Sequence, residues 1–188
     1  MKSTITYFEK PGKINTDAVL EIVKTRAQDL QINTIVVASY RGFTAEKAVR
    51  VLDGKKIIVI GGFLEPNPQN LSETFSNGDE KLIRKKATVL IATHLFSGIN
   101  RAVRKKFDTS SPGEIAAQTL RIVGTGVKVA IECAVMAADA GLVKTDEDVI
   151  SIAGTLSGAD TAIVLRPVNS QDFFDLRLKE ILCKPMVG

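Results

Sequence analysis

Short apolar runs alternate with segments of helical periodicity along most of this chain. Residues 34–39, 55–62 and 88–93 are such runs, and each is followed by a helical pattern. Continuous apolar runs are typical of strands that are buried on both faces of a sheet. The helices between them supply the long crossovers that parallel strands need. We therefore expect an α/β fold, a three-layer α/β/α sandwich around a mostly parallel sheet.

The two ends of the chain modify this pattern. Residues 5–8 alternate apolar and polar side chains before a Lys-Pro-Gly turn, which predicts a short first strand. Two late strands, 149–153 and 161–165, are joined by too few residues for a parallel crossover. They must therefore pair antiparallel, with one reversed strand near an edge of the sheet. The apolar side chains between 173 and 182 suggest a terminal amphipathic helix.

The composition is that of a globular protein. With 188 residues, 45% of them hydrophobic and 24% charged, we expect one α/β/α domain over residues 1–188. The net charge of +4 favours anionic ligands, but no basic stripe with interleaved aromatic residues indicates a nucleic-acid partner. The absence of a long apolar run and of a signal-peptide pattern predicts no membrane association. Cys133 and Cys183 lack a CxxC spacing, which suggests reduced thiols in a cytoplasmic protein.

The pattern of residues 36–46 is that of a strand, a turn and the start of a helix. Such a junction directs free backbone N–H groups and the positive end of the helix dipole at one point, where anions bind. The alternative is purely structural, with Gly42 as a turn residue and Thr44 as an N-cap. The candidate phosphate-binding residues of the junction are Ser39, Arg41, Gly42, Phe43 and Thr44.

The predicted parallel strands end in residues that suit a ligand site. In an open α/β sheet, ligands bind outside the carboxyl ends of the strands. We therefore expect four such ends, together with Gly98 and Asn100, to line one crevice. These ends are Phe8-Glu9, Ser39, Gly61-Gly62 and Thr93-His94.

Two of these residues, His94 and Glu9, have candidate chemical roles of their own. His94, the one histidine of the chain, could be a general acid or base or a phosphate donor, or a polar cap for the next helix. No paired carboxylate or nucleophile is evident near it in the sequence. Glu9 could bind a sugar or ribityl hydroxyl, or be a solvated turn carboxylate. One histidine without a cysteine cluster predicts no metal site.

Three other segments have several candidate roles. Residues 63–79 form a polar, irregular stretch that predicts a long loop, which could form a lid, before a brief basic helix ending near residue 86. Residues 115–140 are apolar on nearly every side, which predicts a core helix or, alternatively, an oligomer interface. Gly124 and Gly126 interrupt that helix. The two basic runs could steer anions, but we expect them to be solvated helix faces. They are Lys81, Arg84, Lys85, Lys86 and Arg101, Arg104, Lys105, Lys106.

The order of these elements resembles the C-terminal domain of pyruvate kinase. The resemblance rests on the segment Ser39-Tyr40-Arg41-Gly42-Phe43-Thr44-Ala45 and on the glycine-rich loop 154–161. Nearly the whole chain is similar to the free-standing archaeal pyruvate kinase C-terminal domain-like proteins. That similarity includes Phe8-Glu9-Lys10-Pro11-Gly12, Ile152-Ala153-Gly154-Thr155 and Gly158-Ala159-Asp160-Thr161-Ala162.

The resemblance implies a binding role. In the kinase this domain is regulatory and often holds a sugar-phosphate effector. By resemblance Ser39, Gly42 and Thr44 would contact phosphate here, and Gly158, Asp160 and Thr161 would belong to a second loop that closes over the ligand. The catalytic barrel of the kinase has no counterpart, so no phosphotransfer from phosphoenolpyruvate is expected. Leu156 lies near the place of an expected aromatic residue, and the segment 63–86 has no counterpart.

Together these patterns predict a domain that binds a small phosphorylated ligand. Flavin mononucleotide (FMN) is the first candidate, with its phosphate on residues 39–44 and its ring against Gly61-Gly62, His94 and the 154–161 loop. A sugar phosphate is the second. The alternatives are an enzyme that uses His94 as acid or base, or a regulatory interaction protein without a ligand site. Each of these is compatible with a homo-oligomer.

Overall fold

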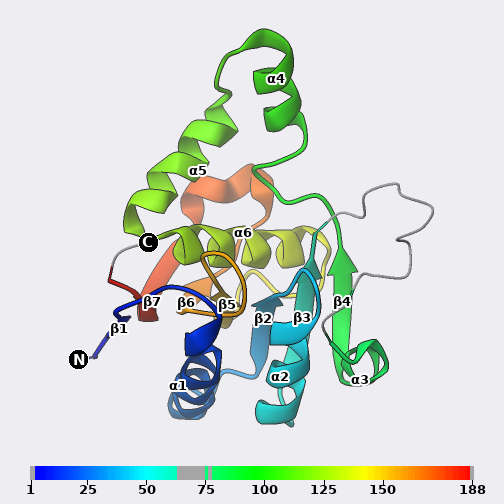
Figure 1. Cartoon of the computed structure of the whole chain (residues 1–188), viewed down its shortest axis with the longest axis vertical. Coiled ribbons are helices and arrows are strands. Elements are labelled where there is room, and N and C mark those ends of the chain that lie inside the picture. The colour runs from blue at the N-terminus through cyan, green and yellow to red at the C-terminus, as the bar shows by residue number, and fades with distance from the viewer. Residues whose placement is uncertain (1–2, 63–74, 76–77, 187–188) are drawn as a thin grey trace.

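The computed structural model describes residues 3–62, 75 and 78–186. In these residues seven strands form one sheet, and helices cover both of its faces (Figure 1). The order of the strands across the sheet is β1-β7-β6-β5-β2-β3-β4. Their bounds are β1 Thr6–Phe8, β2 Thr34–Ala38, β3 Lys56–Gly61, β4 Ala87–Ile91, β5 Val149–Ala153, β6 Thr161–Arg166 and β7 Arg177–Pro185. The predicted α/β/α sandwich is thereby confirmed.

The central strands are buried on both faces, as their apolar runs predict. Ile35 and Val37 of β2 belong to one core cluster, whereas Val36 between them belongs to the other, and all three are 0% exposed. Successive side chains of a strand point to opposite faces, so a strand covered on both sides must be apolar throughout. Burying each such side chain stabilises the fold by about 1.5–3 kcal/mol.

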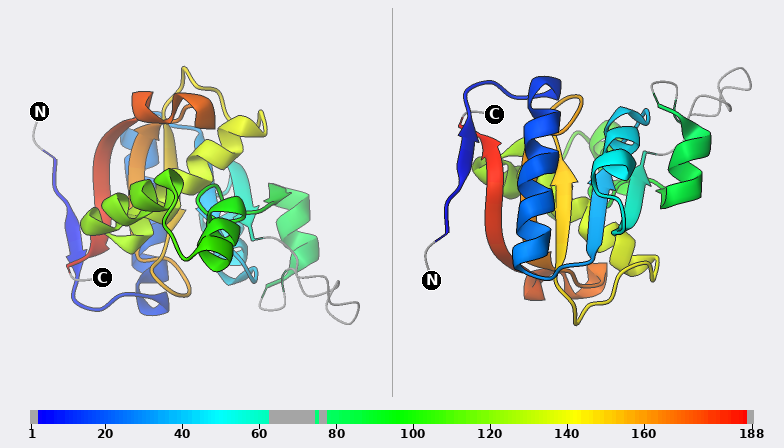
Figure 2. Two further views of the ribbon diagram at one scale, coloured as in Figure 1. Left: turned by 90° about the horizontal axis from the view of Figure 1, so that it is seen from above. Right: turned by 90° about the horizontal axis from the view of Figure 1, so that it is seen from below.

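Two sets of helices cover the two faces (Figure 2). Side chains of α1 (Thr16–Asp29), α2 (Phe43–Val51) and α3 (Glu80–Lys86) pack in the first cluster. Those of α6 (Thr125–Asp139) fill the second, with Leu120 of α5 (Pro112–Val123) against it. The consequence for function is that α2 and α6 lie on opposite faces of neighbouring strands β2 and β5.

The predicted terminal helix is wrong. A short 3-10 helix, Ser170–Asp175, is followed by β7, which pairs antiparallel with β6 and parallel with β1. Ile181 packs in one core cluster and its neighbour Leu182 in the other, an alternation that only an extended chain produces. The segment is extended because its backbone pairs with β6, whose edge would otherwise be unpaired. As a result β6, the reversed strand, is third from one edge, with β7 and β1 outside it.

The apolar segment 115–140 is two helices, α5 and α6. They meet at Gly124, whose φ of 154° lies outside the range of an α-helix. Residues Gly126 to Ala138 of α6 are buried or nearly so, which confirms its role in the core. Gly126 marks a close contact, because a Cβ there would collide with the side chain of Thr161.

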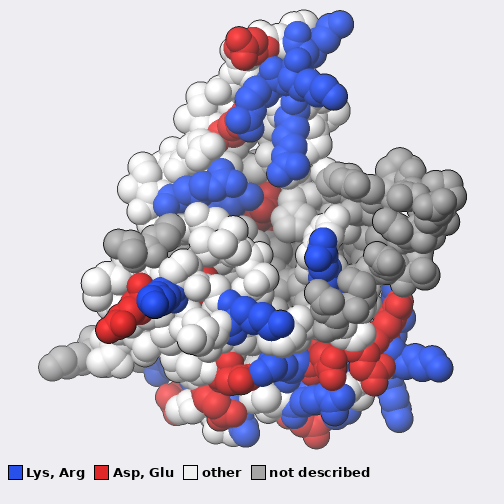
Figure 3. All heavy atoms as spheres, in the orientation of Figure 1, with Lys and Arg blue, Asp and Glu red and all other residues white. Residues whose placement is uncertain are grey.

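Helix α4 (Ile99–Phe107) and helix α5 extend away from the sheet (Figure 1). Large apolar side chains on them, among them Ile99 and Ile122, are exposed at 78% and 85%. The predicted solvated basic face on α4 is confirmed, since Figure 3 shows lysine and arginine side chains gathered over this projection. The basic residues of α3 are exposed as well.

Some predictions concern features that the structure describes only in part. Most of the proposed 63–79 loop lies outside the described residues, but the brief basic helix after it is confirmed as α3. Cys133 and Cys183 are buried and free. Within the described part of the chain, no helix has the length and apolar character required to cross a membrane.

Candidate functional site

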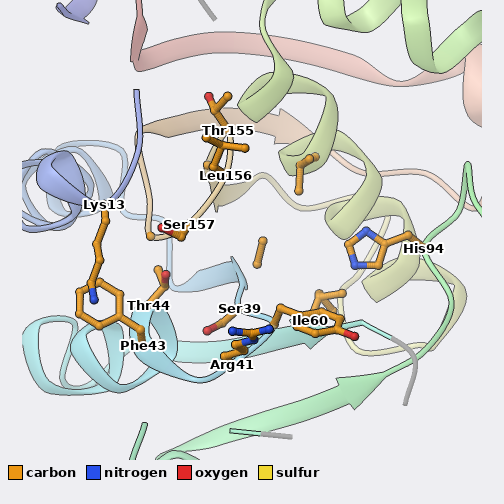
Figure 4. Close-up of a pocket in the computed structure, with 15 residues that line it drawn as sticks. Lys13, Ser39, Arg41, Phe43, Thr44, Ile60, His94, Thr155, Leu156 and Ser157 are labelled. Carbon is orange, nitrogen blue, oxygen red and sulfur yellow. The ribbon is translucent and has the colours of Figure 1, made fainter. Parts of the chain in front are cut away.

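A pocket of about 670 Å³ opens outside the carboxyl ends of β2 and β5, between α2 and α6. This volume is within the range of small-molecule sites. Its floor and walls come from the end of β2, the start of α2, one residue of β3 and the loop after β5 (Figure 4). The lining residues are Lys13, Ala38, Ser39, Tyr40, Arg41, Phe43, Thr44, Ile60, His94, Val129 and residues 154–158.

The N-terminus of α2 forms one end of the pocket. Gly42 is the N-cap with φ 91°, a left-handed conformation that glycine adopts without strain, and a Cβ there would lie 2.9 Å from that of Phe75. The first intrahelical donor is Glu46 N–H, which is bonded to Gly42 O at 2.8 Å. Phe43 and Thr44 precede it, so their N–H groups have no carbonyl one turn back within the helix.

Ser39 acts as a cap for this helix. Its hydroxyl oxygen accepts a hydrogen bond from the backbone N–H of Ala45 at 3.2 Å, and only 7% of the residue is exposed. The bond satisfies one of the free donors of the helix start. The remaining groups that can meet an anion at this end are the Thr44 hydroxyl and the N–H groups of Phe43 and Thr44.

Two cations flank the same end. The ammonium group of Lys13 lies 3.9 Å from the centroid of the Phe43 ring, and Arg41 lines the floor (Figure 4). Lys47 is 5.3 Å from the same ring but also pairs with Asp17 at 2.6 Å. With the helix dipole, these charges make this end of the pocket favourable for an anion.

The glycine-rich loop 154–158 covers the pocket and is held from behind by Asp160. The Asp160 carboxylate, 0% exposed, accepts hydrogen bonds from Gly12 N at 2.8 Å, Thr155 N at 3.0 Å and the Thr161 hydroxyl at 2.8 Å. Asp160 and Thr161 therefore position the loop and do not line the pocket. Gly158, with φ 73°, lets the loop pass close to Lys13.

His94 forms the opposite end of the pocket (Figure 4). Two charged residues of α6, Glu132 and Lys128, lie behind it. Its Nδ1 lies 3.2 Å from Oε2 of Glu132, which also accepts from Lys128 Nζ at 2.5 Å. The other Glu132 oxygen accepts from Phe96 N at 2.8 Å. Burial would raise the pKa of Glu132, but the hydrogen bond from His94 and the charge of Lys128 lower it to about 2.

The structure brings together six of the predicted site residues and separates the others from them. Ser39, Arg41, Phe43, Thr44, His94 and Gly158 line the pocket, and Gly42 forms the turn beneath it. The remaining predicted residues do not line it, namely Phe8, Glu9, Gly61, Gly62, Thr93, Gly98, Asp160 and Thr161.

The single crevice expected at four strand ends is therefore corrected. Strand β1 is separated from β2 by β7, β6 and β5, which removes Phe8 and Glu9 from the site. Gly62 is covered by the ring of Tyr40, which occupies the place of a side chain at this position. Gly98 is the N-cap of α4, and Asn100 accepts a hydrogen bond from Ser111 Oγ at 2.6 Å.

Lys13, Lys128 and Glu132 were not predicted. Lys13 reaches the pocket because β5 and β6 bring the 154–158 loop against the segment before α1. Lys128 and Glu132 do carry a sequence signal. They are two opposite charges four residues apart in an otherwise apolar helix, and such a buried pair requires partners.

The chain matches a known family over most of its length. A family model described as the pyruvate kinase alpha/beta domain matches residues 17–165, from α1 to β6. The chain belongs to the pyruvate kinase alpha/beta domain family. This region of the domain contains every lining residue of the pocket except Lys13.

One solved structure shows a weaker similarity. The NH3-dependent NAD synthetase from Campylobacter jejuni, in complex with a nitrate ion, aligns with 57% of this chain and 46% of that chain, at 16% sequence identity and a TM-score of 0.35. The match spans less than half of the synthetase chain. A likeness at this level supports no inference about function.

Proposed function

We propose that the pocket of this pyruvate kinase alpha/beta domain binds a small phosphorylated ligand. The observation that carries the proposal is the open start of α2, which faces into the pocket between Lys13 and Arg41. Backbone N–H groups, a hydroxyl and two cations are the groups that proteins commonly use for phosphate. The phosphate would lie on Thr44 and the N–H of Phe43.

The rest of the ligand would extend toward His94. The walls between the two ends include the apolar side chains of Ile60 and Val129, and Gly154 offers backbone in place of a side chain. An apolar slot that ends in one imidazole suits a planar heterocycle with polar edges. FMN is therefore the first candidate, and a sugar phosphate is the second.

A second function is supported by the contact between His94 and Glu132. An imidazole supported by a buried carboxylate is a common arrangement for a general acid or base. In that case the protein is an enzyme that acts on the phosphorylated ligand, with His94 as the group that moves a proton. Both functions use the same pocket and the same phosphate end.

Mass spectrometry of the native protein tests the binding proposal. We expect a bound phosphorylated compound that is released on denaturation, with flavin absorbance if it is FMN. Thr44→Ala and Arg41→Ala should carry less of it than the wild type, whereas Arg50→Ala, on the exposed side of α2, should retain it. Retention by both pocket variants would refute the phosphate assignment.

Absence of any bound species, and of a thermal shift across phosphorylated metabolites, would favour a regulatory interaction domain. Turnover that survives His94→Ala would exclude His94 as the base.

A further inference from the structure

His94, Glu132 and Lys128 form a chain of polar groups that runs from the pocket into the core. Glu132 is 0% exposed and the Lys128 side chain 7%, whereas the His94 side chain is 26% exposed and lines the pocket. Lys128 and Glu132 lie on α6, whose apolar residues fill the second core cluster, and the ring of Phe96 is 5.5 Å from Lys128 Nζ. A cluster of this kind is costly to bury unless every member is paired.

Three hydrogen-bond partners fix the orientation of the Glu132 carboxylate. Oε1 accepts from the backbone N–H of Phe96, and Oε2 accepts from Lys128 Nζ and faces His94 Nδ1. A carboxylate can only accept, so the bond at 3.2 Å requires the proton to be on Nδ1. The Nε2 of a neutral imidazole then carries a lone pair.

Lys128 neutralises the charge of the Glu132 carboxylate. Glu132 and Lys128 form an ion pair whose charges cancel, so the carboxylate has a compensating charge without a proton on Nε2 of His94. A buried carboxylate with histidine as its one partner would instead favour the imidazolium.

We propose that Glu132 and Lys128 are positioning residues that hold His94 as the Nδ1–H tautomer, so that Nε2 presents a hydrogen-bond acceptor to the ligand. This inference rests on the proposed function, since it assigns the role of His94 toward a ligand in that pocket. The group recognised is an O–H or N–H at the end of the ligand remote from its phosphate. In an enzymatic step, that proton passes to Nε2, and the electron pair of the broken bond stays on the ligand atom. The imidazolium so formed is stabilised by the Glu132 carboxylate.

The single histidine makes a direct test possible. In protein labelled with 15N-histidine, long-range proton–nitrogen spectra in mildly alkaline solution report which ring nitrogen carries the proton. For the ligand-free wild type we expect the Nδ1–H pattern. Because this measurement needs no ligand, its failure is separate from a failure to bind phosphorylated compounds.

The double variant Lys128→Met, Glu132→Gln should reverse the tautomer. Without Lys128, the amide oxygen of the glutamine introduced by Glu132→Gln is free to accept from Phe96 N–H, and the NH2 group of that amide then donates to Nδ1. The proton of His94 must move to Nε2. Ile32→Val, a change in the packing of the core cluster on the other face of the sheet, serves as control and should keep the Nδ1–H pattern.

Two results would overturn the proposal. One is an Nε2–H tautomer, or a mixture of tautomers, in the wild-type protein. The other is an Nδ1–H pattern that persists in the folded double variant, since Glu132 and Lys128 would then not control the tautomer. If the double variant does not fold, the wild-type spectrum still decides the first point. The milder single variant Glu132→Gln, in which loss of the acceptor-only carboxylate should weaken the preference for the Nδ1–H pattern, then decides the second.

Discussion

The hydroxyl of Ser39 accepts a hydrogen bond from the backbone N–H of Ala45 at 3.2 Å, and this bond gives Ser39 a different role from Thr44 at the start of α2. Ser39 stabilises the start of α2, whereas Thr44 is left to face the pocket. The two residues have the same functional group but different expected phenotypes.

Ser39→Ala should lower the free energy of unfolding by about 1 kcal/mol, since loss of an N-cap acceptor typically has this effect. Urea unfolding followed by circular dichroism measures it. Thr44→Ser keeps the hydroxyl that faces the pocket, so this variant should keep the ligand affinity of the wild type. A Ser39→Ala variant with wild-type stability would show that the bond to Ala45 contributes nothing.

Arg41→Ala should weaken binding of a phosphorylated ligand by about tenfold, because a charge-assisted hydrogen bond contributes on the order of 1.5 kcal/mol. The loss should diminish at high salt, since Arg41 is exposed. Isothermal titration with FMN at two ionic strengths measures both effects. Arg50→Ala removes the same charge from the exposed side of α2 and should change the affinity little, and equal losses in the two variants would mean that only net charge matters.

Glu132→Gln should remove an acid-sensitive part of the stability. The pKa of Glu132 is lowered from 4.5 to about 2 in the folded protein, so its contribution is complete above about pH 4.5 and is lost as the pH falls toward 2. A difference of this size corresponds to about 3 kcal/mol. Denaturant unfolding of wild type and variant should therefore show a stability gap at pH 6 that narrows as the pH falls to 3.

The control for this variant is Glu21→Gln, which removes one carboxylate from the exposed face of α1. It accounts for the general effect of net charge on acid stability. A gap for Glu132→Gln that is the same at both pH values would contradict the assigned role of its ion pair.

Gly42→Ala should destabilise the protein more than Gly54→Ala. Both glycines have left-handed backbone, with φ 91° and 80°, so alanine is strained at either position by about 1 kcal/mol. A Cβ at Gly42 would also lie 2.9 Å from that of Phe75, whereas nothing lies within 4 Å at Gly54. The difference in melting temperature between the two variants isolates this contact. Equal destabilisation would show that the turn adjusts without cost.

Local patterns along the chain predicted most of the sheet. The strands β2, β3, β4 and β5 and the strand-turn-helix junction at Ser39 to Thr44 follow from signals within a few residues. The same type of signal failed for β7, where apolar residues at a helical spacing form a strand because the edge of β6 is open for pairing. Pairing energy from a distant strand outweighed the local spacing.

The sequence by itself therefore determined the layered fold and the end of the pocket formed by the start of α2, because hydrophobic periodicity and turn residues act over short distances. Only the tertiary structure decided which other groups join that end. It removed Phe8 and Glu9 by placing β1 at the far edge, and it added Lys13 through the 154–158 loop. It also joined His94 to Glu132, 38 residues further along the chain. Such contacts depend on strand order and helix packing, which no short segment specifies.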